Sequence, residues 1–309
     1  MIDFVLLSLP IFAVVALGFV AAQTGLMPLA ALDTLGAFSF RFALPALVLR
    51  QIGGQSLAHS FNPAFFGGYL AAGLLAFGLV LALSLMRNRK DVAGAGARAM
   101  SATVSNLGFL GPPLMLAFLG ERGAGPLAMA ILAEIMVLLS LGGAIMGSSQ
   151  GDGARMGSVL LRGAALNPIV AAILLGACLA ASGAPLPSPL DRLLAFLGSA
   201  AGPTALFALG GSLAGRRIDR ATTAAAASVT VVKLVVYPLA VWYVLARLIR
   251  VEPFWIEAGV LISALPSAGS NCVLAQRYGA DADRVSAAIV LSTLASVVTV
   301  PLLAWVMLA

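Results

Sequence analysis

The segment SNLGFLGPPL, residues 105–114, interrupts an apolar stretch that is otherwise long enough to cross a membrane as a helix. Gly108, Gly111, Pro112 and Pro113 weaken or remove helical hydrogen bonds in the middle of this stretch. Lipid cannot satisfy the freed backbone groups, so such a break is stable only inside the protein or beside a water-filled cavity. The segment therefore predicts a discontinuous transmembrane helix next to a site.

A second break of the same kind lies in the segment SALPSAGSNC, residues 263–272. Pro266 interrupts this helix, and Ser267, Ser270 and Asn271 bring polar side chains into an apolar stretch. A proline kink compensated by local hydroxyl groups would explain either break alone. Two matched breaks favour a substrate site.

The helix ends at these breaks indicate what such a site would bind. Beyond each break a second half-helix begins, and its free amide groups and positive dipole end face the centre of the protein. This arrangement favours an anion. Asn106, Ser267, Ser270 and Asn271 add neutral groups that can bind a carboxylate or, through their oxygens, a desolvated cation.

The composition places both breaks in a membrane protein. The 309 residues are 61% hydrophobic and 10% charged, with a mean hydropathy of +1.04, so too few polar side chains exist to cover a water-soluble globule. Short loops separate ten apolar segments of about 20 residues. These predicted spans are 4–22, 34–52, 63–86, 99–119, 125–147, 158–181, 190–213, 221–246, 254–277 and 284–308.

An internal repeat relates the two halves of the chain. A shift of 158 residues aligns residues 10–45 with residues 168–203, with 14 of the 36 positions identical. Each half contains five spans, an odd number, so the second half must enter the membrane from the opposite side. The sequence thus predicts two inverted five-helix repeats, residues 1–150 and 158–309, which are typical of secondary transporters. Asp33 and Asp191 match in this alignment and are interpreted as helix caps.

The distribution of basic residues predicts the orientation of the chain, because Lys and Arg accumulate in cytoplasmic loops. One predicted face carries only five: Arg50, Arg122, Arg192, Arg247 and Arg250. The other carries eleven: Arg87, Arg89, Lys90, Arg98, Arg155, Arg162, Arg216, Arg217, Arg220, Arg277 and Arg284. Both termini should therefore lie outside the cytoplasm. In a membrane protein the net charge of +6 reports this orientation and indicates no nucleic-acid partner.

Three charged residues fall inside predicted spans, where each costs about 2.5–3.5 kcal/mol on insertion scales. Arg41, Glu134 and Lys233 have uncharged counterparts in the other half, which suggests a function added to a symmetric scaffold. One hypothesis pairs Arg41 or Lys233 with a substrate carboxylate and lets Glu134 carry a proton. The alternative is a structural Glu134–Lys233 ion pair.

The sequence offers little for other chemistry. The only histidine, His59, falls in a predicted loop, and the two cysteines, Cys178 and Cys272, lie far apart in different predicted spans. We therefore expect no metal site, no cofactor and no disulfide framework, and an intramembrane enzyme is improbable. An ion channel would need a continuous polar pore, which the apolar breaks do not provide.

Four motifs resemble the auxin efflux carrier family over nearly the whole chain: RFALPALVLR in the second span, SNLGFLGPP in the fourth, LPSAGSNCVLAQRYG in the ninth and RYGADADRVSAAIVLSTLASVVTVPLLAW leading through the tenth. The resemblance implies an all-α membrane fold of ten helices, similar to bile-acid symporters and sodium/proton antiporters. It also implies organic anions as substrates. Bacterial members are described as carriers of malonate or other carboxylates, and plant members export auxin.

The resemblance further implies a division of labour among the helices. Helices 1, 2, 6 and 7 would form a scaffold, through which a homodimer could assemble, and helices 3, 4, 5, 8, 9 and 10 a mobile transport domain in a bacterial inner membrane. Helices 4 and 9 would cross at the substrate site at the midplane. The resemblance assigns the positions at this crossing to Asn106, Pro113, Pro266 and Asn271. It implies that Arg41 reaches the site from the scaffold.

The chain also differs from the family pattern in two respects. The long cytoplasmic loop of many plant members is reduced here to about ten residues around 151–153, which argues against regulation by phosphorylation there. No Asp pair lies at the predicted crossing, which argues against a sodium/proton antiporter. Proton-linked transport is the first reading, and sodium coupling through Ser and Asn oxygens at the breaks remains the alternative within transport.

Overall fold

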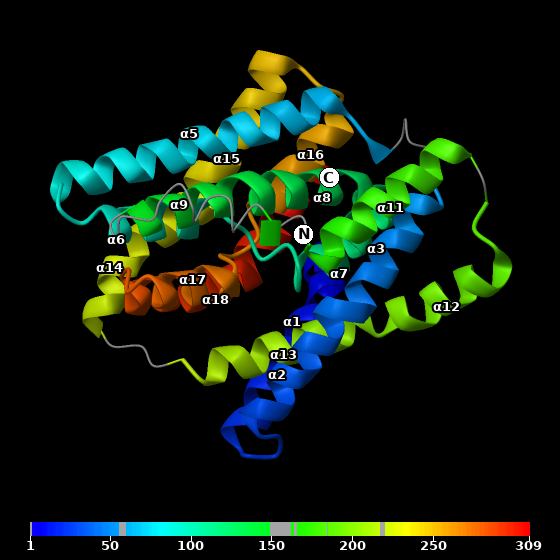
Figure 1. The fold of residues 1–309 in the computed structure, drawn as a ribbon, viewed down its shortest axis with the longest axis horizontal. Coiled ribbons are helices and arrows are strands. Elements are labelled where there is room, and N and C mark those ends of the chain that lie inside the picture. The colour runs from blue at the N-terminus through cyan, green and yellow to red at the C-terminus, as the bar shows by residue number, and fades with distance from the viewer. Residues whose placement is uncertain (1, 56–59, 149–161, 164–165, 184, 217–219) are drawn as a thin grey trace. The chain divides into compact units, whose positions relative to one another are not determined.

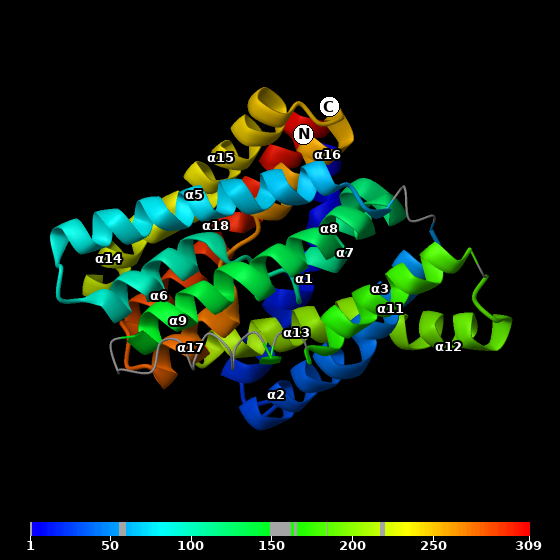
Figure 2. The same cartoon turned by 45° about the horizontal axis from the view of Figure 1, so that its top comes forward.

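The computed structural model describes residues 2–55, 60–148, 162–163, 166–183, 185–216 and 220–309, and this part of the chain is almost entirely helical (Figures 1 and 2). His59, Arg155, Arg217 and the loop around 151–153 lie outside the described residues. Seven of the described helices are long and apolar enough to cross a membrane: Ile2–Gln23, Leu29–Gly53, Pro63–Arg87, Gly111–Ser148, Ser188–Ala214, Thr222–Ile249 and Ala282–Leu308. Two shorter apolar helices are Pro168–Ser182 and Pro253–Ser263.

The chain divides into two compact units, each made from separate stretches of sequence. The first unit contains Met1–Asn62, Leu107–Met129 and Leu166–Arg216, and the second contains Pro63–Asn106, Ala130–Ala165 and Arg217–Ala309. Elements far apart in the sequence therefore fold together.

The first unit is built from helices that pack across large sequence distances. Its elements are α1 (Ile2–Gln23), α2 (Leu29–Phe38), the π-helical segment η1 (Ser39–Ala43), α3 (Leu44–Gly53), α7 (Gly111–Leu119), η2 (Gly120–Gly123), α11 (Pro168–Ser182), α12 (Ser188–Ser199) and α13 (Ala201–Ala214). Helix α1 packs on α13, and α11 lies beside α3 (Figure 2). Small residues allow these close approaches: a side chain at Gly18 would overlap the Phe207 carbonyl, and one at Gly210 would overlap that of Val15.

The second unit contains α6, which ends at the fourth-span break, and both helices that flank the ninth-span break. Its elements are α5 (Pro63–Arg87), α6 (Val92–Thr103), η3 (Leu132–Leu139), α9 (Ser140–Ser148), α14 (Arg220–Val231), η4 (Val232–Val236), α15 (Tyr237–Tyr243), η5 (Val244–Ile249), α16 (Pro253–Ser263), α17 (Gly269–Arg277) and α18 (Ala282–Leu308). Helix α8 (Ala124–Ile131) runs from the first unit into the second. Helix α6 packs on α5 and α9, and α14 packs on α18.

Both sequence breaks are real interruptions of helical structure. Helix α6 ends at Thr103 and α7 begins at Gly111, while α16 ends at Ser263 and α17 begins at Gly269. The predicted fourth span, 99–119, begins too late, because α6 already starts at Val92. The predicted boundary between the fourth and fifth spans coincides with a turn at Gly120, whose φ of 63° favours glycine.

The interpretation of two aspartates as helix caps is wrong. Helix α2 begins at Leu29, so Asp33 lies inside it and does not cap it. Helix α12 begins at Ser188 with Pro187 in the capping position, so Asp191 also lies inside its helix. Asp191 instead accepts a hydrogen bond from Arg50, with 2.7 Å between Arg50 Nε and Asp191 Oδ1. Pairing these two charges explains the acidic residue in the first turn of α12 better than a cap does.

Candidate functional site

The two interrupted segments pair with each other through their backbones. Ser105 and Ser267 form an isolated antiparallel bridge, in which the Asn106 amide donates to the Pro266 carbonyl at 2.7 Å and the Ala268 amide donates to the Val104 carbonyl at 3.1 Å. These bonds satisfy backbone groups that no helix can satisfy at the breaks. The pairing brings residues 104–106 and 266–268 together, and the crossing of the fourth and ninth helices at a substrate site stays a prediction.

Polar side chains of the ninth-span break reinforce the pairing. Asn271 Nδ2 donates to the Val104 carbonyl at 3.2 Å and to Ser267 Oγ at 3.1 Å. Ser267 Oγ donates to the Ser101 carbonyl at 2.8 Å, and the Ser267 amide donates to Ser292 Oγ at 3.1 Å. All of these side chains are buried, so each bond forms without competition from water.

Glu134 is fully buried and accepts hydrogen bonds from Ser105 in the fourth-span break. Its Oε2 accepts from the Ser105 amide at 2.6 Å, and its Oε1 accepts from Ser105 Oγ at 2.9 Å and from Tyr69 Oη at 2.7 Å. Tyr237 Oη lies 3.4 Å from the same oxygen. Charge-assisted hydrogen bonds of this kind are the strong ones, and they offset the cost of burying a carboxylate.

Lys233 is also fully buried and contacts both breaks. Its ammonium donates to Ser105 Oγ at 2.9 Å and to the Ser263 carbonyl, the end of α16, at 2.5 Å. It also lies 4.9 Å from the centre of the Tyr237 ring, a cation–π distance. In the described part of the chain Lys233 and Glu134 form no direct ion pair, and Ser105 Oγ links the two charges.

The three charges predicted inside the membrane share a local backbone feature. Arg41 lies in η1, Glu134 in η3 and Lys233 in η4, and all three segments are π-helical. Such wide turns are uncommon and occur often at functional sites. They could not be predicted from the sequence, because a π-turn changes hydrogen bonding without changing the apolar pattern of the span.

The predicted site residues fall in both units. The second unit contains Asn106, Glu134, Lys233, Pro266, Ser267, Ser270 and Asn271. The first unit contains Arg41, Gly108, Gly111, Pro112 and Pro113. Six of these seven residues of the second unit take part in the hydrogen-bond network around the breaks. The exception is Ser270, which is exposed. Arg41 is also exposed, and its part in a substrate site stays a prediction.

Sequence reasoning missed Tyr69 and Tyr237. Both side chains are fully buried and both hydroxyl groups point to Glu134. A signal existed for Tyr237, because it follows Lys233 by four residues and therefore shares its helix face. Tyr69 carried no such signal, since its contact with Glu134 spans 65 residues of sequence.

Metal chemistry has no support in the part of the chain that the structure describes. No group of three or more His, Cys, Asp or Glu side chains that could hold a metal ion occurs among those residues. Cys178 is exposed and Cys272 is buried, and both are free thiols.

Comparison with known proteins identifies the kind of protein to which this site belongs. A protein of Rhizobium meliloti named "Putative malonate transporter" is 31% identical over 297 residues, which cover 95% of this chain and 92% of that protein. An "Uncharacterized transporter" of Methanothermobacter thermautotrophicus is 28% identical over 298 residues, 95% of each chain. The uncharacterized transporter YfdV of Escherichia coli K12 is 29% identical over 218 residues, 69% of this chain and 68% of that one.

The family described as "Membrane transport protein" matches residues 4–304. This range includes both breaks, Glu134 and Lys233. A match over nearly the whole chain, together with long apolar helices, makes the protein a multi-pass membrane transporter and not an enzyme. The chain belongs to the membrane transport protein family, that of the auxin efflux carriers.

Proposed function

We propose that the protein is a secondary active transporter of a small organic anion, linked to proton movement. The observation that carries this proposal is the buried chain Glu134–Ser105–Lys233, whose members hydrogen-bond to both breaks. A proton added to or removed from this chain would change its hydrogen bonds to both segments at once. Such a link between a charge state and a bistable segment is what coupled transport requires.

Two features support the inverted repeat that this proposal includes. In the 158-residue alignment α1 corresponds to α11 and α3 to α13, and the contacts are reciprocal: α1 packs on α13, and α11 packs on α3. Glu134 aligns with Ser292, and each accepts a backbone amide from a break, from Ser105 and Ser267 respectively. We therefore propose ten spans in two inverted five-helix repeats, residues 1–150 and 158–309, with both termini outside the cytoplasm.

The proposed mechanism is alternating access by an elevator or rocking movement. Helices 1, 2, 6 and 7 would be the scaffold, and helices 3, 4, 5, 8, 9 and 10 the transport domain. The grouping of α1 to α3 with α11 to α13, and of α5, α6 and α14 to α18 in the other unit, supports this division. The segment Leu107–Met129 does not support the division, because it groups with the first unit. Its assignment to the transport domain rests on the family resemblance alone.

The position of Lys233 favours a proton over sodium as the coupling ion. Its ammonium already lies between Ser105 Oγ and the Ser263 carbonyl, two oxygens that a sodium ion would otherwise use. One observation keeps sodium as a second candidate. Asn271 Oδ1 is buried and has no hydrogen-bond partner among the described residues, so it could serve as a cation ligand.

The substrate class rests on the resemblance and on a relative's name. The name of the R. meliloti relative contains malonate, a dicarboxylate, which makes carboxylates the first candidates here. We propose that Arg41 contributes a positive charge to the substrate site from the scaffold side, with Gly108, Gly111, Pro112 and Pro113 on the fourth-span side. Assembly as a homodimer through the scaffold helices also remains a proposal.

Uptake by purified protein in liposomes tests the proposal. Labelled malonate, succinate, acetate and indole-3-acetate would be offered under an imposed proton gradient, an imposed sodium gradient, or neither. The proposal predicts accumulation of at least one anion that follows the proton gradient and is unaffected by replacing sodium with potassium. Accumulation that follows only the sodium gradient would favour the second candidate, and ion currents without accumulation would indicate a channel.

A further inference from the structure

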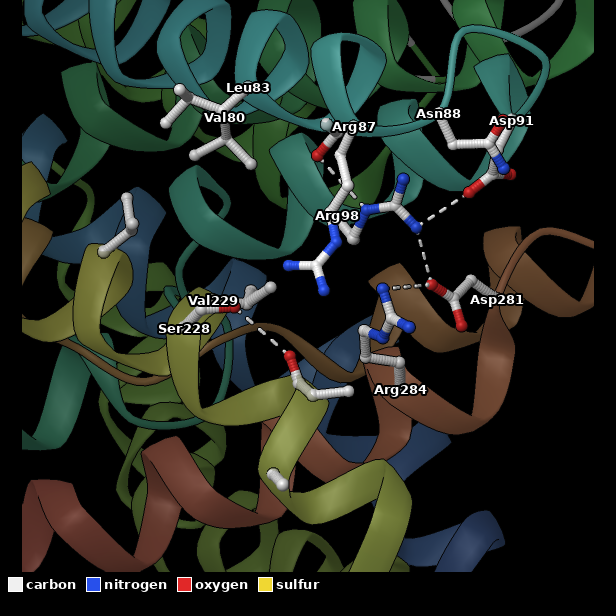
Figure 3. Close-up of a pocket in the computed structure, with 14 residues that line it drawn as sticks. Val80, Leu83, Arg87, Asn88, Asp91, Arg98, Ser228, Val229, Asp281 and Arg284 are labelled. Atoms are coloured by element: carbon white, nitrogen blue, oxygen red, sulfur yellow. Dashed lines mark hydrogen bonds and ion pairs between the residues drawn. The ribbon is translucent and has the colours of Figure 1, made fainter.

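A cleft of about 1030 Å³ lies in the second unit, and none of the residues of the two breaks lines it. It opens between the turn that joins α5 to α6, helix α14, and the turn that joins α17 to α18 (Figure 3). Its size matches the pockets of about 300–1,000 Å³ that hold small organic ligands. The lining residues are Val80, Leu83, Ser84, Arg87, Asn88, Asp91, Arg98, Ala224, Ala225, Ser228, Val229, Val232, Asp281 and Arg284.

One arginine at this cleft is held firmly in place. The Arg98 side chain is only 11% exposed, and its Nη1 lies 2.9 Å from Asp91 Oδ2 and 2.8 Å from Asp281 Oδ2. Its Nε donates to Ser84 Oγ at 3.2 Å. Arg98 thus ties the α5–α6 turn to the α17–α18 turn and fixes the two walls of the cleft.

Two further arginines keep unused hydrogen-bonding capacity. Arg284 Nη1 lies 3.2 Å from Asp281 Oδ2, but its Nε is buried without a hydrogen-bond partner among the described residues. Arg87 forms no ion pair in the described part of the chain, and its guanidinium extends into the cleft beside those of Arg98 and Arg284 (Figure 3). Three arginines against two aspartates leave one positive charge uncompensated.

The rest of the lining indicates what kind of anion would fit. Ser84, Asn88 and Ser228 offer neutral polar groups, whereas Val80, Leu83, Val229 and Val232 form an apolar wall. A small inorganic anion would leave most of this wall in contact with water. An anion with an apolar body would use both the arginines and the wall.

We propose that this cleft binds an amphipathic oxyanion, a phosphate or carboxylate group joined to an apolar body, with Arg87 and Arg284 as its principal ligands. The lining of the cleft shares no residue with the Glu134–Ser105–Lys233 chain, so the proposal concerns a second site in the same unit. Two sources carry this chemistry: a free organic anion and the headgroup of an anionic lipid. The planar guanidinium group binds either one through two parallel hydrogen bonds.

The test uses the full-length protein in nanodiscs of phosphatidylcholine and measures binding of phenyl phosphate by calorimetry. Arg87→Ala removes an unpaired guanidinium from the cleft, and Arg89→Ala removes the same charge from the same turn at a residue that does not line it. We expect Arg87→Ala to weaken phenyl phosphate binding about tenfold, and Arg89→Ala to change it less than about twofold. Both variants should keep the wild-type melting temperature, because neither arginine forms an ion pair with any residue that the structure describes.

A second arm separates the two sources. Native mass spectrometry would count the phosphatidylglycerol molecules that each variant retains from mixed nanodiscs. Retention that falls in Arg87→Ala, but not in Arg89→Ala, would support the site and assign it to a lipid. Phenyl phosphate binding without this difference would support the site and assign it to a free anion. Equal behaviour of the two variants toward both probes would overturn the proposal.

Discussion

In each of the two helix breaks a side chain accepts a hydrogen bond from a backbone amide, but the two acceptors differ. At the fourth-span break the Ser105 amide donates to a carboxylate of Glu134 at 2.6 Å, and at the ninth-span break the Ser267 amide donates to the hydroxyl of Ser292 at 3.1 Å. A neutral hydroxyl is therefore enough to satisfy the backbone of such a break. The charge of Glu134 is more than this structural role requires, and Lys233 at the same serine is its counterpart.

The comparison separates structure from function at the site. If both acceptors served only to hold the backbone, either could be exchanged for a neutral group at similar cost. If Glu134 also carries the proton of the transport cycle, its removal should affect coupling far more than removal of Ser292.

The largest effect is expected from Lys233→Met, which removes the buried ammonium and leaves Glu134 without its counter-charge. Removing one partner of a buried charged pair costs about 3–5 kcal/mol, so we expect a strongly lowered melting temperature and no measurable uptake. The double variant Lys233→Met/Glu134→Gln should recover much of the stability without recovering uptake. A Lys233→Met protein as stable as the wild type would contradict this account of the pair.

An intermediate effect is expected from Ser105→Ala, which removes the hydroxyl that links the two charges. The Ser105 amide can still donate to Glu134, so the break should remain folded. Hydrogen bonds to charged groups contribute about 1.5–3 kcal/mol, and a loss of stability in this range is expected in thermal unfolding. Uptake should fall clearly but not vanish, and a fall no greater than that in Ser292→Ala would argue against the link.

The smallest effect is expected from Ser292→Ala, the neutral counterpart in the other half. It removes one acceptor from the Ser267 amide, at a cost of about 1–3 kcal/mol for the unsatisfied buried group. The dependence of uptake on the proton gradient should stay that of the wild type. A changed proton dependence in Ser292→Ala would show that the two breaks do not differ in the way proposed.

The sequence predicted the breaks well because their chemistry is local. A single proline is tolerated inside an apolar helix, as Pro10 is in α1 and Pro301 in α18, but several closely spaced glycine and proline residues favour an interruption. Both interruptions occur where such residues indicated, at 104–110 and 264–268. The buried charges were equally visible, since any charge inside a span is unusual. Features that depend on one residue in its own segment were therefore predictable.

The start of α6 was missed for a physical reason. Its sequence, VAGAGARAMSAT, is only weakly hydrophobic, because most of its residues are buried against other helices and not against lipid. Small residues suit such packing but give little hydropathy signal. The contacts of Lys233 were unpredictable for another reason, because its partner Ser105 lies 128 residues away in the sequence.

The most direct measurement is anion uptake by Glu134→Gln in liposomes, with and without an imposed proton gradient. Glutamine keeps an oxygen for the Ser105 amide and a similar volume but cannot carry a proton. It also leaves the buried Lys233 ammonium without its counter-charge, at a cost of about 3–5 kcal/mol, so folding of the variant is checked by thermal unfolding before uptake is measured. The account predicts that accumulation driven by the proton gradient is lost in Glu134→Gln and kept in Ser292→Ala. Accumulation by Glu134→Gln that still follows the proton gradient would contradict the central claim.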